Sequence, residues 1–153
     1  TSDFIMDAVE HHFSQLSEQV KSQIPYLQIK VDNGPESSGV RTQFLNRMVD
    51  WVDHIGIPVQ LLYFPPYHSK YNPIERCWGI LELHWNGALL RDEQTMLAWA
   101  QSMTWKGQHP TVTLNSSTYD KGISLTQKEM RPIEQRLLRN PLLPKWDILI
   151  QPL

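Results

Sequence analysis

The first residues of the chain carry apolar side chains at the spacing of an amphipathic helix. In SDFIMDAVEHHFSQLSEQV (residues 2–20) they recur at three- and four-residue intervals behind a Ser2 or Asp3 N-cap. A proline then breaks the pattern, and YLQIKVD (residues 26–32) alternates apolar and polar positions. We therefore predict a helix with one buried face, followed by a short strand with Asp32 at its carboxyl end.

A second helical pattern begins at Val40 and closes near Gly56, and the compact apolar run PVQLLYF (residues 58–64) follows. Strand, helix and strand in this order predict two parallel neighbouring strands joined by a right-handed crossover. The run LLYF lacks alternation, which is typical of a strand covered on both faces. The fold class is therefore α/β.

Two further helices are predicted after this run. The first extends from about Pro73 to Asn86, and the second is capped by Asp92 or a neighbour. On the inner side of the first helix we expect the apolar residues Ile74, Cys77, Trp78, Leu81 and Trp85.

The pattern weakens from Thr104 onward. In the polar, turn-rich stretch that follows, only TVTL (residues 111–114) resembles a strand. Thr126 and Glu129 predict a capping box, and Pro132 is expected to kink or restart its helix. The final apolar run WDILI (residues 146–150) predicts either a last edge strand or an extended tail.

Composition narrows the functional classes. The chain has 153 residues, 41% of them hydrophobic, which suffices for one ordinary core. No apolar run approaches the ~20 residues of a membrane span. The single cysteine, Cys77, excludes an internal disulfide framework, and the net charge of -2 argues against a strongly basic nucleic-acid module.

Two acidic residues fall where ligands gather in α/β sheets. Asp32 ends the first predicted strand, and Glu75 lies in the first turn of the helix after the second strand. Parallel neighbouring strands would bring both to the same edge of the sheet. Carboxylates on separate rigid elements suit Mg²⁺, which binds one or two carboxylates together with water and phosphate oxygens. This pattern favours phosphoryl transfer.

Both acids also have a purely structural interpretation. Asn72 as N-cap, Pro73 at the first helical position and Glu75 at the third would form a capping box without any metal. Asp32 followed by Asn33 and a glycine is a common strand-ending turn. The sequence leaves both interpretations open.

The loop before Glu75 and the residue after it offer groups of the kind that bind nucleic acid. His68, Lys70, Tyr71 and Arg76 supply hydrogen-bond donors and stacking surfaces for a DNA strand. The alternative is that the aromatic residues pack the loop onto the domain and the cations are simply solvated.

Together these stretches resemble a known family. VDNGPE (31–36) and YFPPYHSKYNPIERCWGILELHWNG (63–87) resemble the second and third acidic motifs of DDE-superfamily insertion-sequence transposases. The likeness is closest to the Rhodopirellula-type transposase family, more distant to mariner-type enzymes, and continues into MTWKGQHPTV (103–112).

The resemblance implies an RNase H-like fold that is incomplete at the N-terminus. Residues 1–105 would be the C-terminal portion of the catalytic domain, and residues 106–153 a C-terminal extension. Asp32 and Glu75 would be the second and third acids of a catalytic triad. The first acid would be absent from this chain, because Asp3 and Asp7 lie on a predicted helix.

The activity implied is metal-dependent cleavage and joining of DNA, with two Mg²⁺ or Mn²⁺ ions in the complete domain. The implied partners are the transposon ends, the target DNA and other transposase protomers, without a membrane. The implied location is the bacterial cytoplasm, at the nucleoid when the protein is bound to DNA. We expect negligible DNA cleavage by this chain alone.

Two other functions remain possible from the sequence. The chain could be a truncated, inactive transposase remnant that acts only through protein contacts. The second possible function is that of a metal hydrolase with histidine ligands, although the six histidines show no H-x-x-x-H or H-E-x-x-H spacing.

Overall fold

The computed structural model describes residues 1–65, 68 and 71–153. Two compact units divide the chain: residues 1–66 with 119–153 form the first, and residues 67–118 form the second. No helix among the described residues is long and apolar enough to cross a bilayer. The elements are α1 (Ser2–Ser14), α2 (Glu18–Lys21), β1 (Leu27–Val31), α3 (Thr42–Ile55), β2 (Val59–Tyr63), α4 (Pro73–His84), α5 (Glu93–Ser102), α6 (Gln127–Glu134), β3 (Leu137–Arg139) and β4 (Asp147–Ile150).

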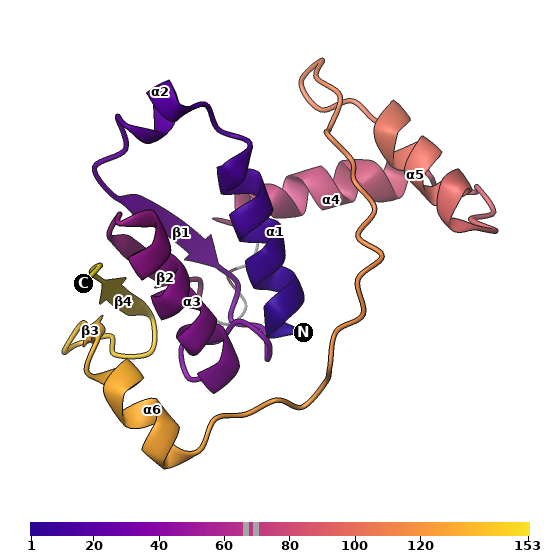
Figure 1. The fold of residues 1–153 in the computed structure, drawn as a ribbon. Coiled ribbons are helices and arrows are strands. Elements are labelled where there is room, and N and C mark those ends of the chain that lie inside the picture. Colours follow the sequence, from indigo (N-terminus) through magenta and orange to yellow (C-terminus); the bar gives the residue numbers. More distant parts are fainter. Residues whose placement is uncertain (66–67, 69–70) are drawn as a thin grey trace. The chain divides into compact units, whose positions relative to one another are not determined.

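The first unit is built on a four-stranded sheet in the order β1-β2-β4-β3 (Figure 1). The strands β1 and β2 are parallel, with Val31 opposite Tyr63, as the strand, helix, strand pattern predicts. The strand β4 runs antiparallel to both β2 and β3. A mixed α/β fold is therefore confirmed.

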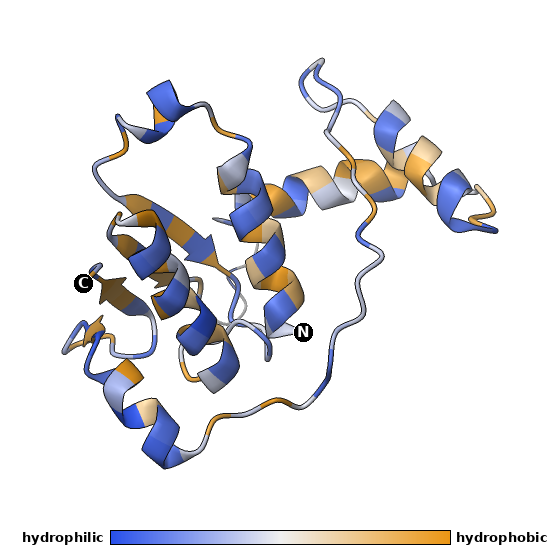
Figure 2. Ribbon diagram, viewed as in Figure 1, coloured by the Kyte–Doolittle hydropathy of each residue, from blue (hydrophilic) through white to orange (hydrophobic). Residues whose placement is uncertain are grey.

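The core lies between one face of this sheet and the helices α1 and α3. Along β1, half-buried or buried residues alternate with exposed ones, and the strand carries both hydrophobic and hydrophilic colours in Figure 2. The α3 residues Phe44, Met48 and Val52 are at most 1% exposed. Burial of a side chain of this size contributes roughly 1.5–3 kcal/mol, so the α3 stripe is a main source of stability. The rest of this cluster includes Met6, Leu45, Val49, Trp51, Val59, Leu61, Ile148 and Ile150.

The helix predicted over residues 2–20 is interrupted in the structure. Its N-cap is Thr1, and α1 ends at Ser14, whose hydroxyl donates to the carbonyl of His11 at 2.7 Å. Ser17 then caps the separate short helix α2. Serine side chains bind nearby backbone groups and so compete with continued helix, which explains the break.

The helix α3 begins and ends close to its predicted limits. Gly56 terminates it with φ of 65°, a left-handed conformation that glycine adopts without steric cost. Val40, however, lies outside the helix and is 59% exposed. The predicted start at Val40 therefore precedes the helix, which begins at Thr42.

Two further strand predictions, for residues 58–64 and 146–150, need correction. Val59, Leu61 and Tyr63 are buried, whereas the intervening residues of β2 are half-buried, so only one face of this strand is fully covered. The run WDILI supplies β4, which lies inside the sheet and not at its edge. The outer neighbour of β4 is β3, which local periodicity did not reveal.

The C-terminal part of the first unit is fastened to α3. The predicted capping box is confirmed, with Thr126 and Glu129 bonded reciprocally at the start of α6. Pro132 lies inside this helix, near its end. Arg136 then donates two hydrogen bonds to the carboxylate of Asp53, at 3.0 and 2.6 Å.

The second unit contains α4 and α5. Asn72 and Asp92 are their N-caps, as predicted. The inner stripe expected on α4 is only partly present: Leu81 is buried, but Ile74 is 43% and Trp78 55% exposed. The described residues 111–114 form no strand, so the TVTL prediction was wrong. A strand needs a partner, and periodicity alone does not supply one.

Candidate active site

Asp32 directly follows β1, at the carboxyl end of the parallel strand pair. Its side chain is exposed, while the preceding Val31 is 8% exposed and fixes the strand end in the core. One carboxylate oxygen, Oδ1, accepts a hydrogen bond from the Asn33 amide at 2.9 Å. The backbone carbonyl of Asp32 accepts a second bond, from the Ser37 hydroxyl at 3.1 Å.

The turn interpretation of Asp32 therefore explains one oxygen of the carboxylate. The second oxygen, Oδ2, makes no hydrogen bond or ion pair with any residue that the structure describes. A carboxylate that closes its own turn with one oxygen can still bind a cation with the other.

Glu75 lies in the first turn of α4 and is exposed. The Asn72 side chain accepts from the Ile74 amide at 3.4 Å, and Pro73 occupies the first helical turn. The reciprocal half of a capping box would join the Glu75 carboxylate to the Asn72 amide. That carboxylate bonds to none of the described residues, so Asn72 caps the helix without it.

The two candidate acids belong to different units of the chain. Asp32 is part of the first unit, and Glu75 is part of the second. That the two carboxylates meet at one edge of the sheet stays a prediction.

The candidate DNA-binding residues lie on the second unit. His68 and Tyr71 stack, with ring centroids 5.9 Å apart and an interplanar angle of 20°. Both are exposed, as is Arg76 in the first turn of α4. Lys70 lies outside the described residues. Aromatic rings and exposed guanidinium groups are side chains of the kind that contact bases and phosphates in nucleic-acid complexes.

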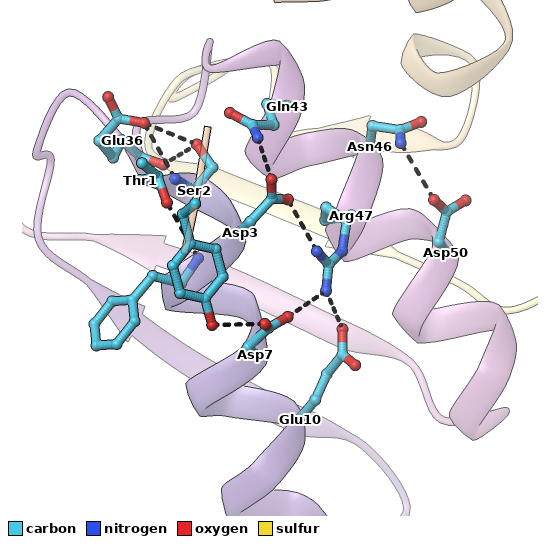
Figure 3. A network of polar contacts seen from close by, with 12 residues as sticks. Thr1, Ser2, Asp3, Asp7, Glu10, Glu36, Gln43, Asn46, Arg47 and Asp50 are labelled. Atoms are coloured by element: carbon cyan, nitrogen blue, oxygen red, sulfur yellow. Dashed lines mark hydrogen bonds and ion pairs between the residues drawn. The ribbon is translucent and has the colours of Figure 1, made fainter. Parts of the chain in front are cut away.

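Asp3 and Asp7 are occupied by a different interaction. Together with Glu10 they form one carboxylate stripe on α1, and all three bind the guanidinium of Arg47 from α3, at 2.9, 2.8 and 3.0 Å (Figure 3). Hydrogen bonds from Arg47 and Tyr119 lower the pKa of Asp7 from its usual 3.8, against an opposing effect of burial. The ion pairs of these carboxylates with Arg47 hold α1 against α3.

Within the described ranges, no group of three or more His, Cys, Asp or Glu side chains is arranged to hold a metal ion. His84 bonds to the Ser102 hydroxyl at 2.9 Å, and His109 bonds to the carbonyl of Met103 at 2.9 Å. These contacts fasten α4 to α5 and the end of α5 to the following turn.

A family model for the Rhodopirellula transposase DDE domain matches residues 1–152. The chain belongs to this family. The comparison with curated proteins and the comparison with solved structures give no match. The match covers both acidic motifs and also the C-terminal strands, so the whole described sheet is part of the transposase DDE domain.

Sequence reasoning missed one unusual side chain of this transposase domain. Tyr63 ends β2 opposite Val31 and is 7% exposed. Its hydroxyl is buried without a hydrogen-bond partner among the described residues. Burial raises the pKa of Tyr63 well above its usual value, although the charge of Arg139 acts in the opposite direction. A tyrosine in a strand gives no sequence signal that its hydroxyl will be unpaired.

We expect Tyr63→Phe to raise the free energy of unfolding by up to about 1 kcal/mol. An unpaired buried hydroxyl loses its bond to water on folding, and phenylalanine keeps the ring while removing that loss. Urea denaturation measures the change. Tyr26→Phe is the matched control, because Tyr26 is 52% exposed and the same substitution there should have no effect. Destabilisation by Tyr63→Phe would contradict the assignment of an unpaired hydroxyl.

Proposed function

We propose that this chain is part of an RNase H-like catalytic domain that cleaves and joins DNA during transposition. Membership of the DDE transposase family is the observation that carries the proposal. In it, Asp32 and Glu75 are the second and third acids of the triad. The first acid is not assigned to any residue of this sequence.

The chemistry of the two carboxylates fits a hard divalent cation. Both are exposed, and neither forms an ion pair with a described cationic side chain. Oxygen donors of this kind are the ligands that Mg²⁺ and Mn²⁺ prefer. When bound, two such ions supply Lewis-acid activation of the attacking oxygen and stabilisation of the leaving oxygen. Asp32 and Glu75 would hold them.

The protein side chains have separate parts in this proposal. The β1 strand end and the N-cap of α4 fix the backbones that carry the two acids. Stacking on His68 and Tyr71 would orient a DNA strand, and Arg76 with Lys70 would bind its phosphates. Further transposase protomers and the two DNA partners, transposon end and target, complete the assembly. The protein would act in the bacterial cytoplasm, at the nucleoid.

The test is metal-dependent cleavage by the transposase protein that carries this domain. We expect it to cut a transposon-end duplex with Mg²⁺ or Mn²⁺ and not in EDTA, whereas the 153-residue chain alone gives negligible cleavage. No cleavage by the transposase with either ion would favour an inactive remnant that acts through protein contacts. Cleavage by the isolated chain would contradict the expectation that the first acid of the triad is not among these 153 residues.

A further inference from the structure

The loop from Asp32 to Arg41 connects β1 to α3 and carries the candidate acid at its first position. Asp32 itself is exposed, and within the described chain its carboxylate bonds only to the neighbouring Asn33 amide. The position of the carboxylate therefore depends on what holds the loop. Metal ligands must be held within about 0.5 Å of a productive geometry, so this support matters for binding.

Glu36 supplies the first attachment of this loop. Its carboxylate oxygen Oε2 accepts from the Ser2 amide at 3.1 Å and from Arg41 Nη2 at 3.2 Å, and its backbone carbonyl accepts from the Ser2 hydroxyl at 2.7 Å. Figure 3 shows Glu36 over the N-terminus of α1. Ser2 is fully buried, so the loop is tied to a fixed point of the first unit.

The far side of the loop is attached to the end of β3 and to the β3–β4 connection. Arg139 Nη1 donates to the carbonyl of Gly39 at 2.9 Å. A Cβ atom at Gly39 would collide with the backbone carbonyl of Lys145, so the two backbones are in close contact. Between these attachments, Ser37 is 8% exposed and returns a hydrogen bond to the Asp32 carbonyl. The loop is thus held at Glu36 and at Gly39, with Ser37 transmitting the position to Asp32.

We propose that Glu36 is a positioning residue, whose bonds to Ser2 and Arg41 hold the loop so that Asp32 is placed for cation binding. The consequence for binding rests on the proposed function, but the positioning itself does not. Glu36 carries a charge of the right sign to attract a cation directly. Arg41 neutralises that charge at 3.2 Å, so the role assigned to Glu36 is its hydrogen bonding.

The first measurement is amide hydrogen exchange in the full chain. The Ser37 amide donates to the Gly34 carbonyl at 3.2 Å within this loop. Glu36→Ala should raise its exchange rate about tenfold or more relative to β4 amides, because the loop loses the charge-assisted bonds of the Glu36 carboxylate. Glu36→Gln keeps an accepting oxygen and should stay near the parent rate. Asp53→Asn is the matched control: it removes the bidentate Arg136 pair elsewhere on α3 and should leave Ser37 unchanged. An unchanged Ser37 rate in Glu36→Ala overturns the proposal.

The second measurement is the Mn²⁺ affinity of the complete transposase, since the first acid is not assigned to this chain. Electron paramagnetic resonance of free Mn²⁺ gives this affinity. Glu36→Ala should weaken the Asp32-dependent affinity about tenfold, the lower end for an outer-shell partner, with Glu36→Gln and Asp53→Asn close to the parent. Equal losses of Mn²⁺ affinity in Glu36→Gln and Glu36→Ala would overturn the proposal, because they would show that Glu36 acts through its charge and not through its hydrogen bonds. If the parent shows no Asp32-dependent binding while Ser37 exchange still responds, positioning is supported and the proposed function fails.

Discussion

Glu75→Gln in the complete transposase is expected to lower the rate of DNA cleavage by more than about a hundredfold. Glutamine keeps the size and the helix position of Glu75 but removes the negative charge that a divalent cation needs. Loss of outer-shell partners alone costs roughly 10- to 100-fold in metal affinity or activity, so loss of a direct ligand should cost more. Single-turnover cleavage of a labelled transposon-end duplex measures the effect.

Glu82→Gln is the matched control for this substitution. Glu82 is exposed on the same helix α4, two turns beyond Glu75, and loses the same charge. Its cleavage rate should stay at the parent value, and both variants should bind the duplex with parent affinity. Equal losses in Glu75→Gln and Glu82→Gln would show a general effect of charge on α4, and full activity of Glu75→Gln would remove Glu75 from the triad.

Arg47→Met is expected to lower the free energy of unfolding by about 2 kcal/mol at pH 7. Removal of one partner from a buried ion pair costs roughly 3–5 kcal/mol, and the Arg47 side chain is 29% exposed, which reduces the penalty. Three carboxylates on one stripe of α1 would remain close together without their shared cation. Methionine preserves most of the apolar stem, so the measurement isolates the charge. Urea denaturation gives the difference.

The pH dependence of this difference identifies its origin. Hydrogen bonding to Arg47 lowers the pKa of Asp7 in the folded protein, so its contribution is present above the usual value of 3.8 and is lost as pH falls through the depressed folded pKa. In Arg47→Met, acid protonates carboxylates that repel each other. The two stabilities should therefore converge as pH falls toward 3.

Asn46→Ala provides the control for the Arg47 variant. Asn46 directly precedes Arg47 in α3. Its side-chain amide donates an exposed hydrogen bond to the carboxylate of Asp50, four residues further along the helix, at 3.2 Å. Asn46→Ala should change the free energy of unfolding by less than about 0.5 kcal/mol, since exposed side-chain pairs four residues apart on a helix contribute only a few tenths of a kcal/mol. An Arg47→Met effect as small as that of Asn46→Ala would show that the carboxylates are fully solvated.

The elements that the sequence predicted well are those with local signals. The helix α3 has a continuous apolar stripe and a terminal glycine, and α4 begins at an Asn-Pro pair. The parallel pairing of β1 with β2 followed from their order around α3. Each of these depends on residues that are close together along the chain.

The elements that the sequence did not predict depend on distant partners. The strand β4 lies between β2 and β3, a placement that only long-range backbone pairing decides. Ile74 and Trp78 have the spacing of buried residues but remain exposed. Near the candidate site, the placement of Asp32 after β1 and of Glu75 in the first turn of α4 was predictable. The support of the Asp32 loop by Ser2 and Glu36 was not, because these residues lie on separate elements.

The insertion of β4 between β2 and β3 also constrains the order of folding during synthesis. The edge of β2 that β4 covers stays open until the ribosome has passed Ile150, after the entire second unit. Closing so long a loop costs entropy that no local contact offsets, and an open strand edge attracts other chains. A nascent chain that stops before Asp147 would therefore lack β4 and leave the edge of β2 unpaired, and such a truncated chain should aggregate.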